Sequence, residues 1–203
     1  TFSKDARDLW SFSLEAGQTI RYNKSWQKLL ANAHRVSAEE LLILHSAYGR
    51  YLGEEVKKFK QANAIRKVDF AASHGHTIFH QPAKGFTFQL GDGYALHQSS
   101  GLPVVWDFRS LDVALGGEGA PLVPIGDRLL FSTYDVCLNL GGIANLSTEV
   151  KGQRKAFDIC FANMGLNYLA QKKRKPFDKE GAMASDGRIN EKLLLSLSKA
   201  YDK

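Results

Sequence analysis

The sequence predicts an α/β protein, on three observations taken along its 203 residues. Apolar and polar side chains alternate over residues 9–15, which is typical of a half-buried strand. Ser37 and Glu40 form a capping box, and the apolar residues that follow them recur at helical spacing. Residues 153–175 have the pattern of a strand, a turn and a helix. Hairpin-like strands mixed with strand–helix units are typical of the α/β class.

The first part of the chain is predicted to contain one strand and two helices. Residues 18–22 continue the strand of 9–15 beyond a turn, and residues 23–34 form a short helix. The helix over 37–63 is the most strongly marked, because its apolar side chains fall on one face. These side chains are Leu41, Leu44, Tyr48 and Leu52, with Leu42 and Val56 nearby.

Shorter elements follow, each bounded by turn-forming residues. They are a buried strand within 67–81, strands over 86–90 and 103–108, a helix near 92–100, a strand over 135–140 and a last helix over 190–203. The glycine-rich stretch over 110–127 is expected to be a loop and the seam between two domains, 1–127 and 128–203.

Composition and charge restrict the function classes. A hydrophobic content of 44% and a charged content of 24% are ordinary for a soluble globular protein. No apolar run reaches the ~18 residues of a membrane-spanning helix. The net charge is +6, but Lys and Arg are scattered, and their densest run, over 171–180, reads as a solvated helix end. The sequence therefore favours neither a nucleic-acid nor a membrane partner.

The two cysteines and the first residues give weaker indications. Cys137 and Cys160 lie in apolar strands without CxxC spacing, which favours small buried side chains in a reducing cytosol, with one disulfide as the alternative. The first ten residues contain neither an initiator Met nor an apolar signal core. We therefore expect the chain to be an internal portion of a gene product.

Four polar or glycine-rich clusters lie at the ends of predicted strands, where α/β proteins bind ligands. They are Ser73–Thr77, Asp107–Pro121, Asn139–Asn145 and Phe157–Asn163. Gly141 and Gly142 end a strand, and their N–H groups would be open to close approach by an anion. A simple β-turn explains the two glycines equally well, because they match neither a P-loop nor GxGxxG.

Acidic and basic side chains supply further candidates. Asp158 follows an apolar run, where partial burial would raise its pKa and make it a general base. The alternatives are that Asp158 caps the next helix or pairs with an Arg. Arg109 lies between Asp107 and Asp112, so it would either clamp a carboxylate or sugar hydroxyls, or order the loop through ion pairs.

A pair of histidines precedes the Thr77 hydroxyl. His74 and His76 have the His-x-His spacing of a metal pair. No acidic or Cys partner stands at ligand spacing, so a hydrogen-bonding role is favoured over zinc, and no metal ligand is assigned.

Six stretches in a fixed order resemble the anhydro-N-acetylmuramic acid kinase family, sugar kinases of bacterial cell-wall recycling. They are "SHGHTIFHQP", "FTFQLGDGYAL", "VVWDFRSLDVALGGEGAPLVP", "LNLGGIANLS", "FDICFANMGLNYLA" and "KPFDKEGAMASDGRI", and they cover roughly residues 68–190. The resemblance implies an actin-like ATPase fold of two α/β domains around a cleft. It also implies ATP, Mg²⁺, a small amino-sugar substrate and a cytoplasmic location, and leaves a homodimer open.

The family's reaction gives roles to residues of this chain. Water attacks the anomeric carbon of the 1,6-anhydro sugar, and the freed 6-oxygen takes the γ-phosphoryl group of ATP. The resemblance makes Asp158 the base that activates the water. It places Thr77, Asp107 and Arg109 on the sugar side. The second phosphate loop would contain Gly141, Gly142 and Asn145, and Asn163 would follow the base in the same cleft.

The chain departs from the family pattern at several points. It contains neither the Gly-Thr-Ser-x-Asp-Gly phosphate loop nor the adenosine pocket, so we expect the first domain to lack its first strand and this chain alone to be inactive. Residue 76 is His where Gln is common. Phe161 and Ala162 replace residues that adopt positive φ easily. The alternatives are a non-catalytic actin-like module that binds a nucleotide or a partner and, ranked last, a chaperone ATPase.

Overall fold

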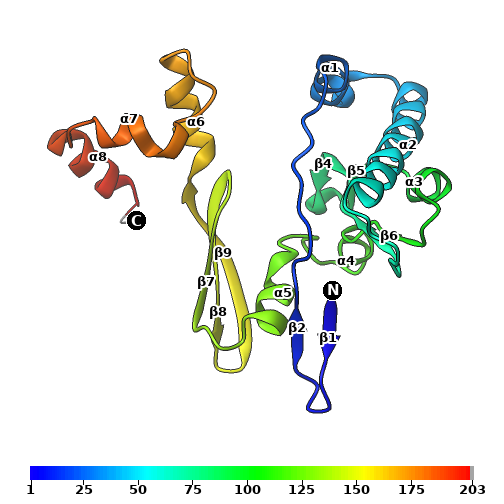
Figure 1. The fold of residues 1–203 in the computed structure, drawn as a ribbon. Helices are drawn as coiled ribbons and strands as arrows, with labels where there is room; N and C mark the ends of the chain where they lie inside the picture. The colour runs from blue at the N-terminus through cyan, green and yellow to red at the C-terminus, as the bar shows by residue number, and fades with distance from the viewer. Residues whose placement is uncertain (202–203) are drawn as a thin grey trace. The chain divides into compact units, whose positions relative to one another are not determined.

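Helices and strands are interspersed along the computed structural model, which describes residues 1–201 (Figure 1). The contacts divide the chain into one unit that ends at Leu130 and a second that begins at Phe131. Each unit contains both helices and strands, which confirms the predicted α/β class.

The helices of the first unit begin where the sequence supplies caps. The Asn23 side chain accepts a hydrogen bond from the Trp26 N–H at the start of the first helix. Ser37 and Glu40 form the predicted capping box. The helical segments are α1 (Lys24–Asn32), η1 (Ala33–Arg35), α2 (Ala38–Ala62), η2 (Pro82–Lys84), α3 (Gly93–Ser100), α4 (Ser110–Ala114) and α5 (Val123–Leu130).

The strands of the first unit form three two-stranded sheets. β1 (Phe2–Lys4) pairs antiparallel with β2 (Trp10–Phe12), and β4 (His76–Gln81) pairs antiparallel with β5 (Phe86–Leu90). β3 (Ala71–Ser73) and β6 (Val104–Trp106) run parallel.

Three predictions for this unit need correction. The strand expected over 9–15 is limited to β2, and residues 18–22 form no strand. The stretch over 110–127 is not simply a loop, because α4 lies within it and α5 begins there. Helix α4 is only five residues long, and α5 contains Pro and Gly, so the local pattern does not mark them.

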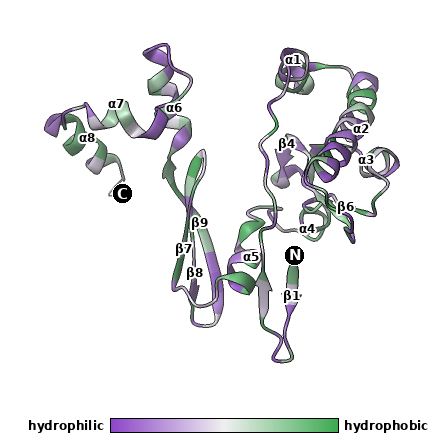
Figure 2. Ribbon diagram, in the orientation of Figure 1, coloured by the Kyte–Doolittle hydropathy of each residue, from purple (hydrophilic) through white to green (hydrophobic). Residues whose placement is uncertain are grey.

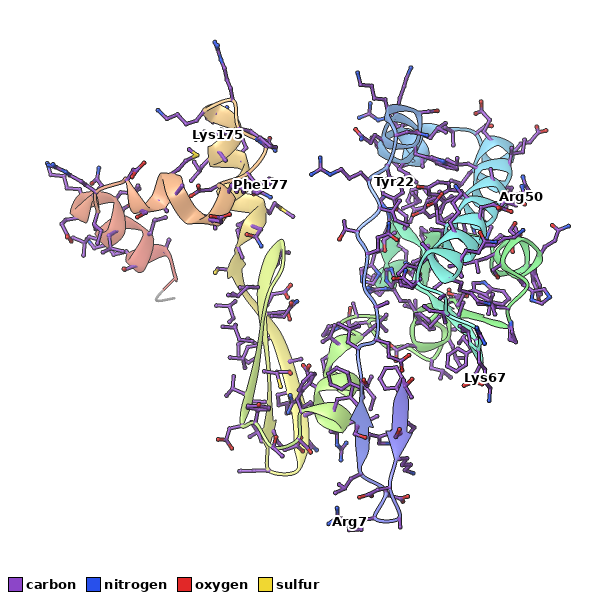
Figure 3. All side chains as sticks on the ribbon, viewed as in Figure 1. Arg7, Tyr22, Arg50, Lys67, Lys175 and Phe177 are labelled. Carbon is purple, nitrogen blue, oxygen red and sulfur yellow. The ribbon has the colours of Figure 1, made fainter. Side chains whose placement is uncertain are left out.

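The core of the first unit lies between α1, α2 and β5. Its buried side chains are Leu30, Ala33, Leu44, Tyr48 and Leu90, and the partly buried Leu41 and Leu52 pack against them. This confirms the predicted apolar face of α2. The hydroxyl groups of Tyr22 and Tyr48 lie 2.5 Å apart. Figure 3 shows Tyr22 on the extended stretch that precedes α1, and Arg50 on the side of α2 that faces away from this stretch.

Two glycines of α2 allow α3 to approach closely. A Cβ on Gly49 would lie 2.3 Å from the Asp92 carbonyl oxygen, and one on Gly53 would lie 2.7 Å from that of Leu96. Helix α3 follows the β5 strand directly, so this contact fixes the turn that joins them. Glycine is required at both positions for packing rather than for its φ angle.

The second unit is an antiparallel meander followed by helices. β7 (Val136–Leu140), β8 (Ile143–Val150) and β9 (Gln153–Phe161) pair in sequence order. The helical segments are α6 (Asn163–Lys172), η3 (Lys179–Gly181), α7 (Ala182–Ser185) and α8 (Glu191–Tyr201). Figure 2 shows hydrophobic residues along β7. The last predicted helix extends to residues 202–203, which lie outside the described residues.

The cysteines are both free in the structure. Cys137 on β7 and Cys160 on β9 are half-buried rather than buried as predicted, and no disulfide joins them.

Candidate functional site

The first cluster lies where the parallel strands β3 and β6 end. Ser73 and Trp106 are partners in the register, so His74 and Asp107 leave adjacent strands at the same edge. The carboxyl ends of parallel strands are the usual ligand-binding edge of an α/β sheet. The structure therefore brings two of the four predicted clusters together.

Gly75 determines the path of the chain after His74. Its φ is +70°, and a Cβ there would lie 2.4 Å from the Leu90 carbonyl oxygen. Only glycine accommodates both conditions at low cost. The chain can therefore turn from β3 into β4 against the end of β5, which leaves the His74 ring directed toward the loop after β6.

Arg109 is held by two hydrogen bonds from different parts of the first unit. Its Nε–H donates to Nε2 of His74 (2.9 Å), and Nη1 donates to the Gly119 carbonyl oxygen (2.9 Å). The side chain is half-buried, and this burial lowers the pKa of the guanidinium. The predicted hydrogen-bonding role of His74 is confirmed.

The expected ion pairs around Arg109 are not formed among residues 1–201. Asp107 accepts hydrogen bonds from the backbone N–H and hydroxyl of Ser110 instead (3.3 and 2.5 Å). Asp112 accepts the Gly119 N–H (2.6 Å). The loop is thus ordered by hydrogen bonds between these carboxylates and other residues of the same loop. Neither carboxylate forms an ion pair with the positively charged guanidinium of Arg109.

Asp107 has an unusual backbone conformation. Its φ is +57°, in the left-handed region that non-glycine residues rarely adopt. Such strain at the carboxyl end of a strand is a common feature of binding sites. The side chain is exposed, so Asp107 is accessible to a ligand.

Thr77 lies in β4 directly opposite Gln89 of β5. The Thr77 side chain is exposed. The Oε1 atom of Gln89 is buried and has no hydrogen-bond partner in the part of the chain that the structure describes. No sequence pattern marks Gln89, because only the strand register reveals that it lies beside Thr77.

The second cluster is built on the turn between β7 and β8. The Gly142 carbonyl oxygen accepts the N–H groups of Ala162 and Met164 (2.9 and 3.0 Å), and that of Gly141 accepts the Asn163 N–H (3.1 Å). The Asn163 side chain donates to the Leu140 carbonyl oxygen (3.1 Å). The turn is therefore fastened to the start of α6, and Asn163 acts as its support.

The chain itself does not require glycine at this turn. A Cβ on Gly141 would have its nearest contact at 3.6 Å, and one on Gly142 would meet only the Met164 side chain, at 3.9 Å. Neither residue has a positive φ. The carbonyl oxygens of this turn are already hydrogen-bonded. The missing side chains of both glycines leave its backbone accessible to a ligand.

A row of polar side chains crosses the sheet beside this turn. Asn145 is the register partner of Asn139 on β7 and of Asp158 on β9. Cross-strand partners point to the same face, so the three side chains share one face of the sheet. A register shift between Ala144 and Asn145 creates this alignment. Asn139 and Asn145 both belong to a cluster that the sequence marks, but their alignment with Asp158 depends on this irregularity, which is not visible in the sequence.

Asp158 differs from its predicted environment in two respects. Its side chain is exposed, so the expected partial burial is wrong for the described residues. Residue 162 is the N-cap of α6 and makes no side-chain capping bond, so Asp158 does not cap that helix. Asp158 makes no ion pair with an Arg among residues 1–201. The carboxylate is therefore available to a ligand or to water.

The motif that follows Asp158 folds without glycine. Ala162 has φ −112° and ψ −109°, and Phe161 ends β9. Neither residue has a positive φ, so the expected need for a glycine-like conformation does not arise.

Residues 1–201 contain neither a metal-binding cluster nor a membrane-spanning helix. No group of three or more His, Cys, Asp or Glu side chains within this range could hold a metal ion. None of the helices in the same range combines the length and apolar character needed to cross a membrane.

Comparison with known proteins points to one family. The family model described as anhydro-N-acetylmuramic acid kinase matches residues 14–201. A protein of that name from Methylobacterium nodulans is 40% identical over 154 residues, which cover 71% of this chain and 41% of the relative. Another from Vibrio cholerae is 43% identical over 148 residues, covering 70% and 39%. The chain spans about two fifths of the length of these curated relatives.

Proposed function

We propose, because the chain belongs to the anhydro-N-acetylmuramic acid kinase family, that it supplies part of the active site of such a kinase. The enzyme would open 1,6-anhydro-N-acetylmuramic acid with water and phosphorylate its 6-oxygen, giving N-acetylmuramic acid 6-phosphate. The two units would belong to two actin-like domains, 1–127 and 128–203, and the enzyme would act in the cytoplasm, where ATP is present.

The polar row beside the double-glycine turn carries this proposal. Asp158 is an exposed carboxylate on the same sheet face as Asn139 and Asn145, and the adjacent turn has glycines at 141 and 142 where a Cβ would fit without a clash. A sugar kinase needs a base for its nucleophile and backbone amides close to a phosphate. One short antiparallel sheet would supply both.

The reaction can be written with its bonds balanced. Asp158 accepts a proton from water while the water oxygen bonds to the anomeric carbon, and the bond from that carbon to the bridging 6-oxygen breaks. The 6-oxygen then attacks the γ-phosphorus of ATP, and the bond to the β,γ-bridging oxygen breaks to release ADP. The amides near Gly141 and Gly142 would face the phosphate groups, with Asn145 and Asn163 holding the turn.

The loops of the first unit would bind the sugar. Arg109 is a cation that neither neighbouring carboxylate neutralises, and Asp107 and Thr77 present exposed oxygen atoms. Hydroxyl and carboxylate groups of an amino sugar match these donors and acceptors. Arg109 would bind the carboxylate of the muramic acid.

Mg²⁺ is the metal that phosphoryl transfer commonly uses. Residues 1–201 contain no cluster of side chains that could hold a metal ion alone. The described residues therefore do not form a complete magnesium site, and no step is assigned to the metal.

The decisive experiment measures ATP-dependent phosphorylation of the anhydro sugar by the longest natural polypeptide that contains this chain. Asp158→Asn removes the base but keeps the size of the side chain, so we expect turnover to fall by about 10²–10⁴-fold. Asp135→Asn is the matched control, because Asp135 is also exposed in the second unit but lies outside the polar row. We expect its turnover to be unchanged.

Three outcomes separate the alternatives. Wild-type turnover in Asp158→Asn would exclude this residue as the base. ATP binding without any phosphorylation of the sugar would favour a non-catalytic actin-like module. The 203-residue chain by itself is expected to be inactive, and saturable phosphorylation by this chain alone would contradict that expectation.

A further inference from the structure

We infer that His74 is a positioning residue that orients Arg109 toward the sugar through a neutral imidazole with its proton on Nδ1. This inference rests on the proposed function, because it concerns the arginine that would bind the sugar. It adds a residue that touches no substrate. His74 lies at the end of β3, and Arg109 lies in the loop after β6.

The two ring nitrogens of His74 have different partners. Nε2 lies 2.9 Å from Nε of Arg109, whose N–H is a donor only, so Nε2 must be the acceptor. Nδ1 lies 3.1 Å from the Gly75 carbonyl oxygen, which is an acceptor only, so Nδ1 must carry the proton. One neutral tautomer satisfies both contacts, and the other tautomer satisfies neither.

Arg109 is clamped from two directions as a result. Nε2 of His74 accepts a hydrogen bond from Nε–H of Arg109, and the Gly119 carbonyl oxygen accepts one from Nη1. The Gly119 N–H in turn donates to Asp112, which holds the carbonyl in place. A planar guanidinium fixed at two of its nitrogens has a defined orientation. Its Nη2 has no partner within residues 1–201 and remains available to a ligand.

The backbone around both ends of the clamp is specialised for it. Gly75 needs its positive φ and its missing Cβ to turn the chain beside the Leu90 carbonyl. At Gly119, φ is +65°, and a Cβ would lie 2.7 Å from the Val113 side chain. Both glycines are thus required by close packing, and they place the two acceptors of Arg109.

The same contacts argue against a metal role for His74. Both ring nitrogens are engaged, so binding a metal through either would break a hydrogen bond of the clamp. His76 is half-buried, and this burial lowers the pKa of the His76 ring. No hydrogen bond joins His76 to Arg109, whose Nε–H and Nη1 donate to His74 and Gly119, so the His-x-His spacing contains one positioning histidine rather than a metal pair.

The hydrogen bond itself can be tested on the 203-residue chain, without any measurement of activity. The chain is labelled with ¹⁵N, and the spectra are recorded at about pH 8, where histidine is ordinarily neutral. We expect the Nδ1–H tautomer for His74 and a scalar coupling across the hydrogen bond between Nε of Arg109 and Nε2 of His74. An Nε2–H tautomer, or the absence of the coupling, would overturn the inference.

Its functional consequence is tested with paired variants in the longest natural polypeptide that contains this chain. His74→Gln places a carbonyl oxygen near the position of Nε2 and keeps an acceptor for Arg109. His74→Leu keeps much of the volume but accepts no hydrogen bond. His80→Leu is the control, because His80 bonds Thr87 and not Arg109.

We expect His74→Leu to raise KM for the anhydro sugar by about 10- to 100-fold, the effect of losing one hydrogen bond to a charged group. Arg109 would bind substrate and transition state alike, so kcat should change little. His74→Gln should restore KM to within about threefold, and His80→Leu should leave KM unchanged.

The outcomes separate this inference from the proposed function. Equal KM values for wild type, His74→Leu and His74→Gln would overturn the positioning role and leave the kinase intact. A wild type without turnover would remove the proposed function and, with it, the sugar as the ligand. The coupling would then decide alone whether His74 orients Arg109.

Discussion

At the scale of single residues, the structure distinguishes glycines that the chain needs from glycines that it leaves unused. Gly75 is needed, because its φ is +70° and its Cβ would meet the Leu90 carbonyl oxygen. Gly141 and Gly142 are not needed for φ or for packing. A glycine that neither its φ angle nor the packing of the described residues requires, and that lies beside a polar row, indicates a functional role. The space beside it is not filled by a close contact within the described residues.

Gly142→Ala should therefore separate ligand binding from folding. We expect the free energy of unfolding to be unchanged or to rise by up to about 1 kcal/mol, since alanine restricts the unfolded chain. The KM for ATP should increase, because the new methyl group occupies the space open to the phosphate groups. Urea unfolding of the chain and steady-state kinetics of the longest natural polypeptide that contains it check the two parts.

Gly152→Ala is the matched control for this prediction. A Cβ on Gly152, like one on Gly142, would meet no close neighbour, but the φ of Gly152 is +75°. Alanine there should lower the free energy of unfolding by about 1 kcal/mol and leave the KM for ATP unchanged. If Gly142→Ala destabilised the chain without altering the KM for ATP, the turn would be structural and its phosphate role would be wrong.

At the scale of elements, a histidine links α2 to the turn between β5 and α3. The Gly91 N–H donates to Nδ1 of His45 (2.9 Å), and the Asp92 N–H donates to the His45 carbonyl oxygen (3.1 Å). Burial lowers the pKa of the His45 ring, and the charges of Asp92 and Asp107 oppose this to a smaller extent. The folded chain therefore favours neutral His45, whose Nδ1 can accept the bond.

This linkage predicts a loss of stability in mild acid. A lowered folded-state pKa means that the unfolded chain binds the proton more readily. The stabilisation that neutral His45 contributes is therefore complete above the ordinary pKa of 6.5. It is lost as the pH falls from there through the folded-state pKa. We expect the Tm of the chain to be lower at about pH 5 than at about pH 7.5.

His45→Asn tests the assignment, because the amide oxygen of asparagine can accept the Gly91 N–H and does not titrate. Burial also lowers the pKa of His76, so some pH dependence should remain in this variant. The difference in Tm between the two pH values should nevertheless shrink. An undiminished difference in His45→Asn would show that His45 does not carry the effect.

The elements that the sequence predicts well are those with local signals. The capping box of Ser37 and Glu40 and the apolar face of α2 lie within one helix, so no tertiary information is needed. By contrast, α4 and α5 are short and contain no caps that the sequence marks. Strand β1 was missed because it has only three residues, too few for a pattern to be recognised, and it pairs only with β2.

In the candidate site, too, residues with a local sequence signal could be predicted, and contacts between distant residues could not. Asp158 and the two glycines stand in local strand-and-turn patterns, so the sequence could single them out. The alignment of Asn139, Asn145 and Asp158 depends on the irregularity in the β8–β9 register. The contact of Arg109 with His74 joins residues 35 positions apart, and an ion pair with a neighbouring Asp was the closer expectation. Long-range pairing cannot be obtained from residue spacing alone.

At the scale of the whole molecule, the two units differ in how much apolar surface they bury. The first unit encloses large side chains, among them Tyr48 (2% exposed) and Leu96 (1% exposed). In the described residues of the second unit, the buried side chains are small: Ala144, Ser147 and Ala170. Local stability follows buried apolar surface, so the first unit should be the more stable part of the chain.

Hydrogen exchange of the 203-residue chain should reveal this difference. We expect amides of α2 and α3 to exchange slowly, through global unfolding of the first unit. Amides of β7, β8 and β9 should exchange faster, because opening that sheet exposes little additional apolar surface. Mass spectrometry of peptides from each element measures both rates. Equal protection of α2 and β7 would contradict the prediction.

A pair of leucine variants tests the cause of that difference. Leu96→Ala removes a buried side chain and should lower the free energy of unfolding by about 2–5 kcal/mol, which would speed exchange throughout α2 and α3. Leu138→Ala removes a side chain that is 55% exposed on β7. Its effect should stay below about 1 kcal/mol, with exchange in β7 nearly unchanged. If Leu138→Ala were as destabilising as Leu96→Ala, the β7 face would be packed in solution, and unequal burial could not explain unequal protection.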